Sequence, residues 1–442
     1  MNKRFSAAFL TLALALSLSA CGGSPAPADE LSDAAQASDG QAHAQTVDGQ
    51  AHAQAVDEQD AAQSIVEPSA PKTVKVGLIC TGDENELSET YNFIRGKNDA
   101  SVMLAAEGVD AEWVVKWSVP ESADAERANR ELAADGCQLI VNTAPGYEEF
   151  MLKVAPAYPD IQFVACGGRV SRADDLPNTH NAYANIHEGR YLAGVVAGLK
   201  LQELLDAGAI APGEAVIGYI GASDNAETVS AYTAYFLGAR SVCPDVSMKV
   251  LFAGTRLDAA AERNAASALA DMGCQLISQQ SGAFIPAAVA QSAGILHTGY
   301  NNDMTPVAPG ASLVSTRIDW YAYFDRAIRA VLDGDELEQD WSHGLDAYAV
   351  ELTPLNRDLI ADGTDEKLDE VKAALADGSL QAFDTSTFTV NGETITHAFA
   401  LDTDGDSVPD AQEAVFDGAF RESYFQSAPY FALDIDGIEK LN

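Results

Sequence analysis

The sequence predicts an α/β fold made of two similar lobes, and three observations support this prediction. Short apolar runs alternate with helical patterns of about ten to fifteen residues, which is typical of βαβ units and a parallel sheet. This alternation begins near Lys72 and starts again near Ala215. The phrase Gly-Cys-Gln-Leu-Ile occurs at 136–140 and again at 273–277, each time after an Ala-rich stretch. The repeated helix–Gly–strand unit indicates two lobes of similar construction.

The elements of the first lobe follow from its apolar pattern. The first strand, at 74–80, is an almost continuous apolar run, as expected for a parallel strand whose sheet is covered by helices on both faces. Further strands are expected at 112–117, 138–142 and 161–165, and helices at 90–107, 123–134 and 147–157.

The second lobe repeats this arrangement. Strands are expected at 215–220, 247–252, 275–278 and 294–298, and helices at 226–241 and 258–272. In open α/β sheets, ligands bind at the carboxyl ends of the strands. A cleft between two such lobes is a natural place for a small molecule, and closure about a hinge would bury it.

The charge and the motifs exclude several classes of function. The 442 residues include 66 acidic and 26 basic side chains, for a formal charge of −40. A surface this acidic repels nucleic acids and anionic lipid headgroups, so neither is an expected partner. The chain has no G-x-S-x-G elbow, H-E-x-x-H motif or Walker loop, and no G-x-G-x-x-G follows the first strand. We therefore predict that the chain is not an enzyme.

The N-terminus has the features of a targeting segment. Lys3 and Arg4 precede an apolar stretch at 5–18, which is too short to span a bilayer. The segment ends in Leu18-Ser-Ala-Cys21, which resembles the lipobox of bacterial lipoproteins. This resemblance implies a signal peptide at 1–21, lipidation of Cys21, and an extracytoplasmic protein anchored to the cell membrane. The alternative is an ordinary secretory signal that contains a cysteine by chance.

The expected domain organisation follows from changes in composition. After the signal peptide, 22–71 is rich in Ala, Gln, Asp and Gly and contains a short repeat, so it cannot bury enough apolar surface to fold alone. We predict a tether there. The remaining limits are 72–200 for the first lobe, 201–320 for the second, and 321–442 for a return to the first lobe followed by a tail. The five cysteines after Cys21 are odd in number and widely spaced, which does not favour a disulfide framework, and Cys80, Cys137 and Cys166 are expected to be buried thiols.

Several phrases occur in an order that resembles the basic membrane protein (BMP) family, the nucleoside-binding lipoproteins of ABC transporters. The resemblance covers about 74–356 and implies a type I periplasmic-binding-protein fold, in which two Rossmann-like lobes joined by a hinge enclose a ligand cleft. The phrases are Thr90-Tyr-Asn92, Gly146-Tyr147, the stretch 186–198 that contains Tyr-Leu-Ala-Gly, Gly218-Tyr-Ile-Gly221 and Thr298-Gly-Tyr-Asn-Asn-Asp303.

The resemblance implies a purine or pyrimidine nucleoside, or a related small molecule, in the cleft and an ABC permease as partner. Tyr91 or Tyr147 could stack on a base, and Asn92 could bond its edge. Asp303 could accept hydrogen bonds from ribose hydroxyls, and Trp320 could form a wall. Arg256 would favour an anionic or carbonyl-bearing ligand; its stretch, 255–258, lacks the Trp that the family has there. The alternative function is a ligand-sensing lipoprotein of the same fold that signals to a membrane partner.

The tail contains an acidic loop with the spacing of a calcium site. Oxygen ligands fall at loop positions 1, 3, 5, 7, 9 and 12, as a hard cation requires of one short segment. Position 6 is Ser407, where a helix-loop-helix site has Gly. The loop is a candidate for a structural Ca²⁺ site, and the alternative is a solvated acidic turn. The ligands would be Asp402, Asp404, Asp406, the Val408 carbonyl, Asp410 and Glu413.

Overall fold

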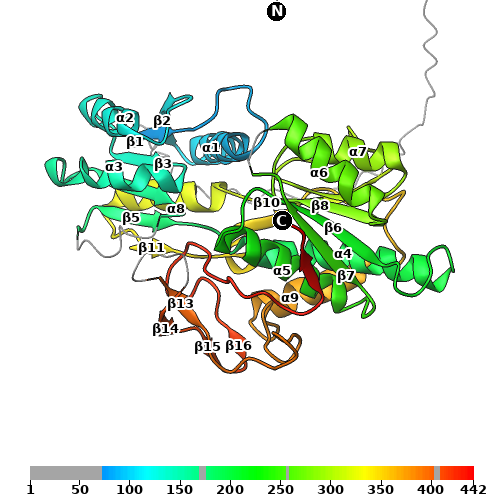
Figure 1. The fold of residues 1–442 in the computed structure, drawn as a ribbon. Coiled ribbons are helices and arrows are strands. Elements are labelled where there is room, and N and C mark those ends of the chain that lie inside the picture. Colours follow the sequence, from blue (N-terminus) through cyan, green and yellow to red (C-terminus); the bar gives the residue numbers. More distant parts are fainter. Residues whose placement is uncertain (1–71, 169–175, 255–257, 403–408) are drawn as a thin grey trace, which may run out of the picture. The chain divides into compact units, whose positions relative to one another are not determined.

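The computed structural model describes residues 72–168, 176–254, 258–402 and 409–442 (Figure 1). The chain divides into two units at Glu67 and Pro68, and all the described residues belong to the second unit. Cys21 and the predicted tether lie outside the described residues. Within them, no helix combines the length and the apolar character needed to cross a bilayer.

The first lobe is a six-stranded parallel sheet in the order β11-β5-β4-β3-β1-β2. Helices α1 and α8 cover one face, where Phe93 and Phe324 pack on Val76. Helices α2 and α3 cover the other, where Leu132 packs near Ile140. The elements are β1 (Lys72–Ile79), α1 (Glu89–Ala106), β2 (Val109–Lys116), α2 (Ala123–Ala134), β3 (Leu139–Asn142), α3 (Glu148–Leu152), β4 (Gln162–Cys166), β5 (Thr179–Ala182), α8 (Tyr321–Asp333) and β11 (Asp340–Trp341).

The second lobe has seven strands in the order β12-β10-β9-β8-β6-β7-β17, all parallel except β12. Helices α4, α5 and α9 contribute to the main core of this lobe, and α6 packs on the opposite face. The elements are α4 (Ile186–Asp206), β6 (Val216–Gly221), α5 (Ala226–Arg240), β7 (Ser247–Phe252), α6 (Ala259–Asp271), β8 (Leu276–Gln279), α7 (Ile285–Ala293), β9 (Leu296–Tyr300), β10 (Ser312–Ile318), β12 (Val350–Leu352), α9 (Thr364–Ala376) and β17 (Ile438–Lys440).

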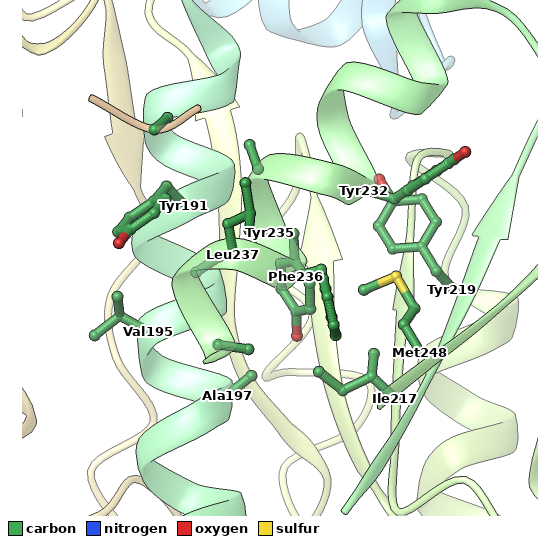
Figure 2. Close-up of a cluster of buried hydrophobic side chains, with 14 of the residues drawn as sticks. Tyr191, Val195, Ala197, Ile217, Tyr219, Tyr232, Tyr235, Phe236, Leu237 and Met248 are labelled. Atoms are coloured by element: carbon green, nitrogen blue, oxygen red, sulfur yellow. The ribbon is translucent and has the colours of Figure 1, made fainter. Parts of the chain in front are cut away.

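The core of the second lobe is built on a close crossing of α4 and α5. Figure 2 shows Tyr191 and Val195 on α4 and Phe236 and Leu237 on α5, all of them members of one buried apolar cluster. A Cβ added at Gly194 would lie 2.0 Å from the Tyr235 carbonyl oxygen, and one at Gly238 would lie 2.0 Å from the Tyr191 carbonyl oxygen. Only glycine lets the two backbones approach this closely.

The predicted boundary between the lobes at residue 200 is wrong. The chain enters the second lobe at Ile186, because all of α4 packs against α5 and β10. After residue 320, α8 and β11 pack on the first sheet. The later elements β12, α9 and β17 belong instead to the second lobe. The apolar pattern does not say which sheet a helix covers, so this boundary needed the tertiary contacts.

The helix predicted at 147–157 is also interrupted. It consists of a 3₁₀ turn at Pro145–Tyr147, the short helix α3, and a second 3₁₀ turn at Ala155–Ala157. Pro156 explains the interruption, because proline has no backbone N–H and its ring disfavours the helical conformation of the preceding residue.

The residues after α9 add aromatic side chains to the main core of the second lobe. Two hairpins occur there, β13 (Phe399–Leu401) with β14 (Ala411–Glu413) and β15 (Val415–Phe416) with β16 (Ala419–Phe420), drawn in orange tones in Figure 1. Phe383 and Phe431 stack with their ring centroids 4.3 Å apart, and Phe420 meets Phe431 edge-on. Cys80, Cys137 and Cys166 are buried free thiols, as predicted, and the described Cys243 and Cys274 are buried and free as well.

Candidate functional site

A cavity of about 330 Å³ lies between the two lobes at the carboxyl ends of their strands. The first lobe contributes side chains from α1 and from the segments that follow β3, β4 and β5. The second lobe contributes the segments that follow β6, β9 and β10. The lining residues used below are Glu89, Asn92, Phe93, Glu148, Tyr183, Glu227, Tyr300, Asn301, Trp320, Ala428 and Pro429.

Two buried asparagines meet across the cavity, one from each lobe. Asn92 lies in the first turn of α1 and Asn301 directly follows β9, and each is 2% exposed. The Asn92 Nδ2 group donates to Asn301 Oδ1 over 3.2 Å. Among the described residues, Asn92 Oδ1 and Asn301 Nδ2 have no hydrogen-bond partner. A buried polar atom without a partner costs about 1–3 kcal/mol, so this amide pair is a strong candidate for binding a ligand.

Two further hydrogen bonds join the lobes around the cavity. The Tyr183 hydroxyl, just after β5, donates to Glu227 Oε1 on α5 over 3.3 Å. The Gly282 N–H, beyond β8, donates to Ser88 Oγ over 3.0 Å. The structure therefore has the lobes in direct contact around the cavity, as expected for a closed binding protein.

Aromatic rings form much of the wall. Phe93 and Trp320 stack on each other with their centroids 4.1 Å apart. The guanidinium of Arg190 lies over the Tyr300 ring at 4.0 Å, and Arg190 also donates to the Gln279 carbonyl over 3.1 Å. Burial raises the pKa of the Tyr300 phenol and the Arg190 cation opposes this, so the hydroxyl stays neutral. The cavity thus combines apolar faces with a few fixed polar groups, which is typical of small-molecule sites.

Three carboxylates are among the residues that line the cavity. Glu89, Glu148 and Glu227 line it, whereas none of the described lining residues is a lysine or arginine. A carboxylate accepts hydrogen bonds from hydroxyl groups and repels phosphate. Judged by the lining residues that the structure describes, the site suits a solute that carries hydroxyl groups.

Of the predicted ligand-binding residues, Asn92 and Trp320 line the cavity. Tyr91 does not line it: this residue is 37% exposed, because neighbouring positions on a helix point about 100° apart. Tyr147 lies in the core of the first lobe, where its hydroxyl donates to the Val119 carbonyl over 2.5 Å. Asp303 also lies away from the cavity and accepts a hydrogen bond from the Thr305 N–H over 2.9 Å.

Sequence reasoning missed six residues that line the cavity: Glu89, Glu148, Tyr183, Glu227, Tyr300 and Asn301. The signal that could have found them is their position: Glu148 and Tyr183 follow strands, and Tyr300 and Asn301 lie in the quoted phrase that ends at Asp303. Arg256 lies outside the described residues.

The predicted calcium loop is described only at its ends. Asp404, Asp406 and Val408 lie outside the described residues, while Asp402, Asp410 and Glu413 lie within them. One Glu413 oxygen accepts hydrogen bonds from the Ala398 and Val415 N–H groups, and the other lies 2.9 Å from His397 Nδ1. Elsewhere in the described chain, no group of three or more His, Cys, Asp or Glu side chains is arranged to hold a metal ion.

Comparison with known families gives a match over most of the chain. Residues 93–379 match Bmp, described as "ABC transporter substrate-binding protein PnrA-like". A purine-binding protein of Brucella abortus is 31% identical over 315 residues, which is 71% of this chain and 84% of that protein. A protein of Haloferax volcanii, provisionally named an ABC transporter glucose-binding protein, is 32% identical over 222 residues, half of this chain and 52% of that protein.

Solved structures with the same fold include two solute-binding proteins of ABC transporter systems. The protein from Conexibacter woesei is 22% identical, with a TM-score of 0.54 over 70% of this chain and 98% of that chain. The protein from Aeropyrum pernix is 17% identical, with a TM-score of 0.57 over 70% of this chain and 93% of that chain. These similarities and the two parallel sheets confirm the predicted two-lobed α/β fold.

Proposed function

Since the chain belongs to the Bmp family of PnrA-like ABC transporter substrate-binding proteins, we propose that it binds a purine nucleoside or a related purine and delivers it to an ABC permease. The predicted resemblance is thereby confirmed. The family consists of solute-binding proteins, so the prediction that the chain is not an enzyme is confirmed as well. ABC substrate-binding proteins act outside the cytoplasm, which agrees with the predicted compartment.

The amide pair of Asn92 and Asn301 is the observation that carries the purine proposal. It leaves one acceptor and one donor without partners, side by side and buried. If the oxygen and nitrogen of both side-chain amides were exchanged, Asn301 would donate to Asn92. One donor and one acceptor would again be left without a partner. A purine edge offers the complement, such as the N7 acceptor and N6 donor of adenine. The similarity to a purine-binding protein supports the same ligand class.

The carboxylates that line the cavity support a ligand with hydroxyl groups, such as a nucleoside. Carboxylates of Glu89, Glu148 or Glu227 can accept hydrogen bonds from ribose hydroxyls, the role that the sequence had suggested for Asp303. The same carboxylates would suit a sugar, so a hexose is the second candidate.

We further propose that Cys21 is lipidated and that 22–71 tethers the binding unit to the membrane. More than one lipid chain gives stable anchoring, and the tether's composition keeps it from packing into a core. Labelling of cells with a radioactive fatty acid should mark the wild-type protein and not Cys21→Ser, and Cys21→Ser should be recovered away from the membrane fraction. Equal labelling of both proteins would contradict the proposal.

The test of the ligand is calorimetric titration of the purified protein with inosine, adenosine, hypoxanthine, adenosine monophosphate and glucose. We expect binding of the nucleosides. Asn92→Ala or Asn301→Ala should each weaken purine binding by about tenfold or more, because the ligand loses a bond in a buried site. Asn98→Ala, at an exposed position of the same helix, is the matched control. Glucose binding without purine binding would reject the purine and keep the solute-binding role.

A further inference from the structure

The chain continues beyond the residues that match the family, and this continuation reaches the ligand cavity. The match ends at residue 379, whereas Ala428 and Pro429 line the cavity. Ala428 is 2% exposed and Pro429 is buried. One wall of the site is therefore supplied by a segment that the family comparison does not cover.

This C-terminal segment, 380–442, is firmly attached to the second lobe. Phe431, two residues after Pro429, is fully buried in the main core of that lobe and stacks on Phe383. Further along, β17 adds a parallel strand beside β7. The Asn442 side chain then accepts a hydrogen bond from the Phe252 N–H over 2.8 Å and donates one to the Phe252 carbonyl over 2.9 Å. These contacts hold the chain on the C-terminal side of Pro429.

The other side of the wall is attached to the first lobe. The Ser427 N–H donates to both carboxylate oxygens of Asp340, at 3.1 and 3.0 Å. Asp340 begins β11, the edge strand of the first sheet. Ser342, just beyond β11, donates through its hydroxyl to the Ser423 carbonyl over 3.2 Å. Ala428 and Pro429 are thus held between contacts to both lobes.

The chemistry of these two side chains limits what the wall can do. A methyl group and a pyrrolidine ring form no hydrogen bonds, and Pro429 has no backbone N–H to offer. Proline also fixes its own φ angle, so the wall cannot easily move aside for a larger ligand. Such a surface discriminates between solutes by their size and shape rather than by polar contacts.

The order of the first sheet places this wall away from the amide pair. Asn92 lies on α1, which follows β1, whereas the wall is tied to β11. The strands β5, β4 and β3 lie between these two. A solute held by one edge at Asn92 and Asn301 therefore extends its remaining part toward Ala428 and Pro429.

We propose that Ala428 and Pro429 form a shape-selective wall of the ligand site. The wall limits the size of the part of the solute that lies farthest from the base edge bound by Asn92 and Asn301. The proposal rests on the proposed purine ligand. For a nucleoside, that part is the sugar. The wall accepts an unmodified ribose and excludes a sugar with a bulky 5′ substituent. The C-terminal segment is then part of the specificity of the site and not only a surface addition.

The test is to enlarge Ala428 and to compare a free base with its nucleoside. Ala428→Leu should weaken inosine binding by about tenfold or more while leaving hypoxanthine binding nearly unchanged, because only the nucleoside reaches the wall. Ala373→Leu, the same change at an exposed position of α9, is the control. In the opposite direction, Pro429→Gly should allow binding of a 5′-substituted inosine that the wild-type protein excludes.

The outcomes separate the two proposals. If the wild-type protein binds neither inosine nor hypoxanthine, the purine proposal fails, and the wall is tested with the panel solute that does bind. Suppose that the wild-type protein binds inosine and that the thermal melt shows Ala428→Leu to be folded. If this variant binds inosine as well as the wild type does, the wall proposal is overturned. If Ala428→Leu does not fold, Ala428→Val takes its place, and unchanged inosine binding by that variant likewise overturns the proposal.

Discussion

At the residue scale, His297 and the asparagine pair illustrate two groups of buried polar side chains. The first group is hydrogen-bonded within the core, and the second leaves an atom without a partner at the cavity. His297 belongs to the first, since its ring nitrogens meet Gln279 Oε1 at 2.9 Å and Ser312 Oγ at 3.3 Å. Burial lowers the pKa of His297 to about 3, so the ring stays neutral and serves the core. Asn92 and Asn301 belong to the second group, because each keeps a buried atom without a partner at the edge of a cavity. The unpartnered atom and the position at the cavity together mark Asn92 and Asn301 as candidate ligand-binding residues.

Glu188 gives a prediction about pH. Burial raises the pKa of the Glu188 carboxyl to about 7. The Leu345 N–H donates to this carboxyl over 2.7 Å and opposes the rise. The nearby Asp346 charge raises the pKa further, whereas His343 lowers it. The folded protein therefore binds more protons than the unfolded chain between about pH 4.5 and 7, and stability falls as the pH rises through this window.

Glu188→Gln removes this charge. At about pH 8 we therefore expect the variant to have a higher melting temperature than the wild type, with a free energy of unfolding that is larger by about 2 kcal/mol. Near pH 4.5 the difference should be small. Glu366→Gln, at an exposed position of α9, is the control and should show no such dependence on pH. A variant whose melting temperature differs equally from the wild type at both pH values would contradict this account.

At the scale of elements, glycine decides how α4 packs. Gly194 and Gly198 lie one turn apart on α4, and a Cβ at Gly198 would lie 2.4 Å from the Ala239 carbonyl oxygen. Glycine costs helix stability in an isolated helix, yet here it permits a crossing that buries the aromatic cluster of Figure 2. The packing of two helices thus outweighs the propensity of one.

Gly194→Ala should therefore destabilise the protein by about 3 kcal/mol or more, because the new methyl group meets a backbone carbonyl that no change of side-chain rotamer can relieve. Chemical denaturation measures this difference. Gly310→Ala adds the same methyl group where the nearest atom is 3.5 Å away, and it should change stability little. Equal stability of the two variants would argue against backbone contact at the crossing.

The loop between β13 and β14 gives a prediction about calcium. If the acidic residues bind Ca²⁺ as their spacing predicts, millimolar Ca²⁺ raises the melting temperature by mass action and a chelator reverses the effect. The double change Asp404→Asn and Asp406→Asn should abolish the shift. A melting temperature that responds identically to Ca²⁺ and Mg²⁺, or to neither, would favour the solvated acidic turn.

At the scale of the whole binding unit, the closed arrangement depends on close contact between lobes. The chain passes between the lobes after β5, after β10 and between β11 and β12. Away from these crossings, Ser88 of the first lobe meets Gly282 of the second, and a Cβ at Gly282 would lie 2.6 Å from the Ser88 Cα. This contact leaves no room for a larger side chain while the lobes are closed.

Gly282→Val should hold the lobes apart, so we expect weaker binding of the ligand with little change in the melting temperature of the ligand-free protein. Small-angle scattering should show that saturating ligand no longer compacts the variant as it does the wild type. Ser88→Ala keeps the close approach while losing the hydrogen bond, and it should bind nearly as well as the wild type. A Gly282→Val protein with unchanged affinity would show that closure does not require this contact.

The sequence by itself determined the α/β class, the two lobes and most elements, because hydrophobic periodicity and turn residues act over short stretches of chain. The helix at 123–134 and the strand at 247–252 agree with the structure at both ends. The motif order was also sufficient to identify the family. These features depend on local physics, or on phrases that can be read in one dimension.

Only the tertiary structure decided which residues reach the cavity and which lobe each connecting element joins. Tyr91 and Asn92 are neighbours in one phrase, yet the turn of α1 exposes the first and buries the second beside Asn301. Ala428 lies far along the chain from both and still lines the same cavity. The physical reason is that a ligand site at the strand ends gathers side chains from many segments, and their convergence depends on sheet order and helix packing, which no single stretch of sequence encodes.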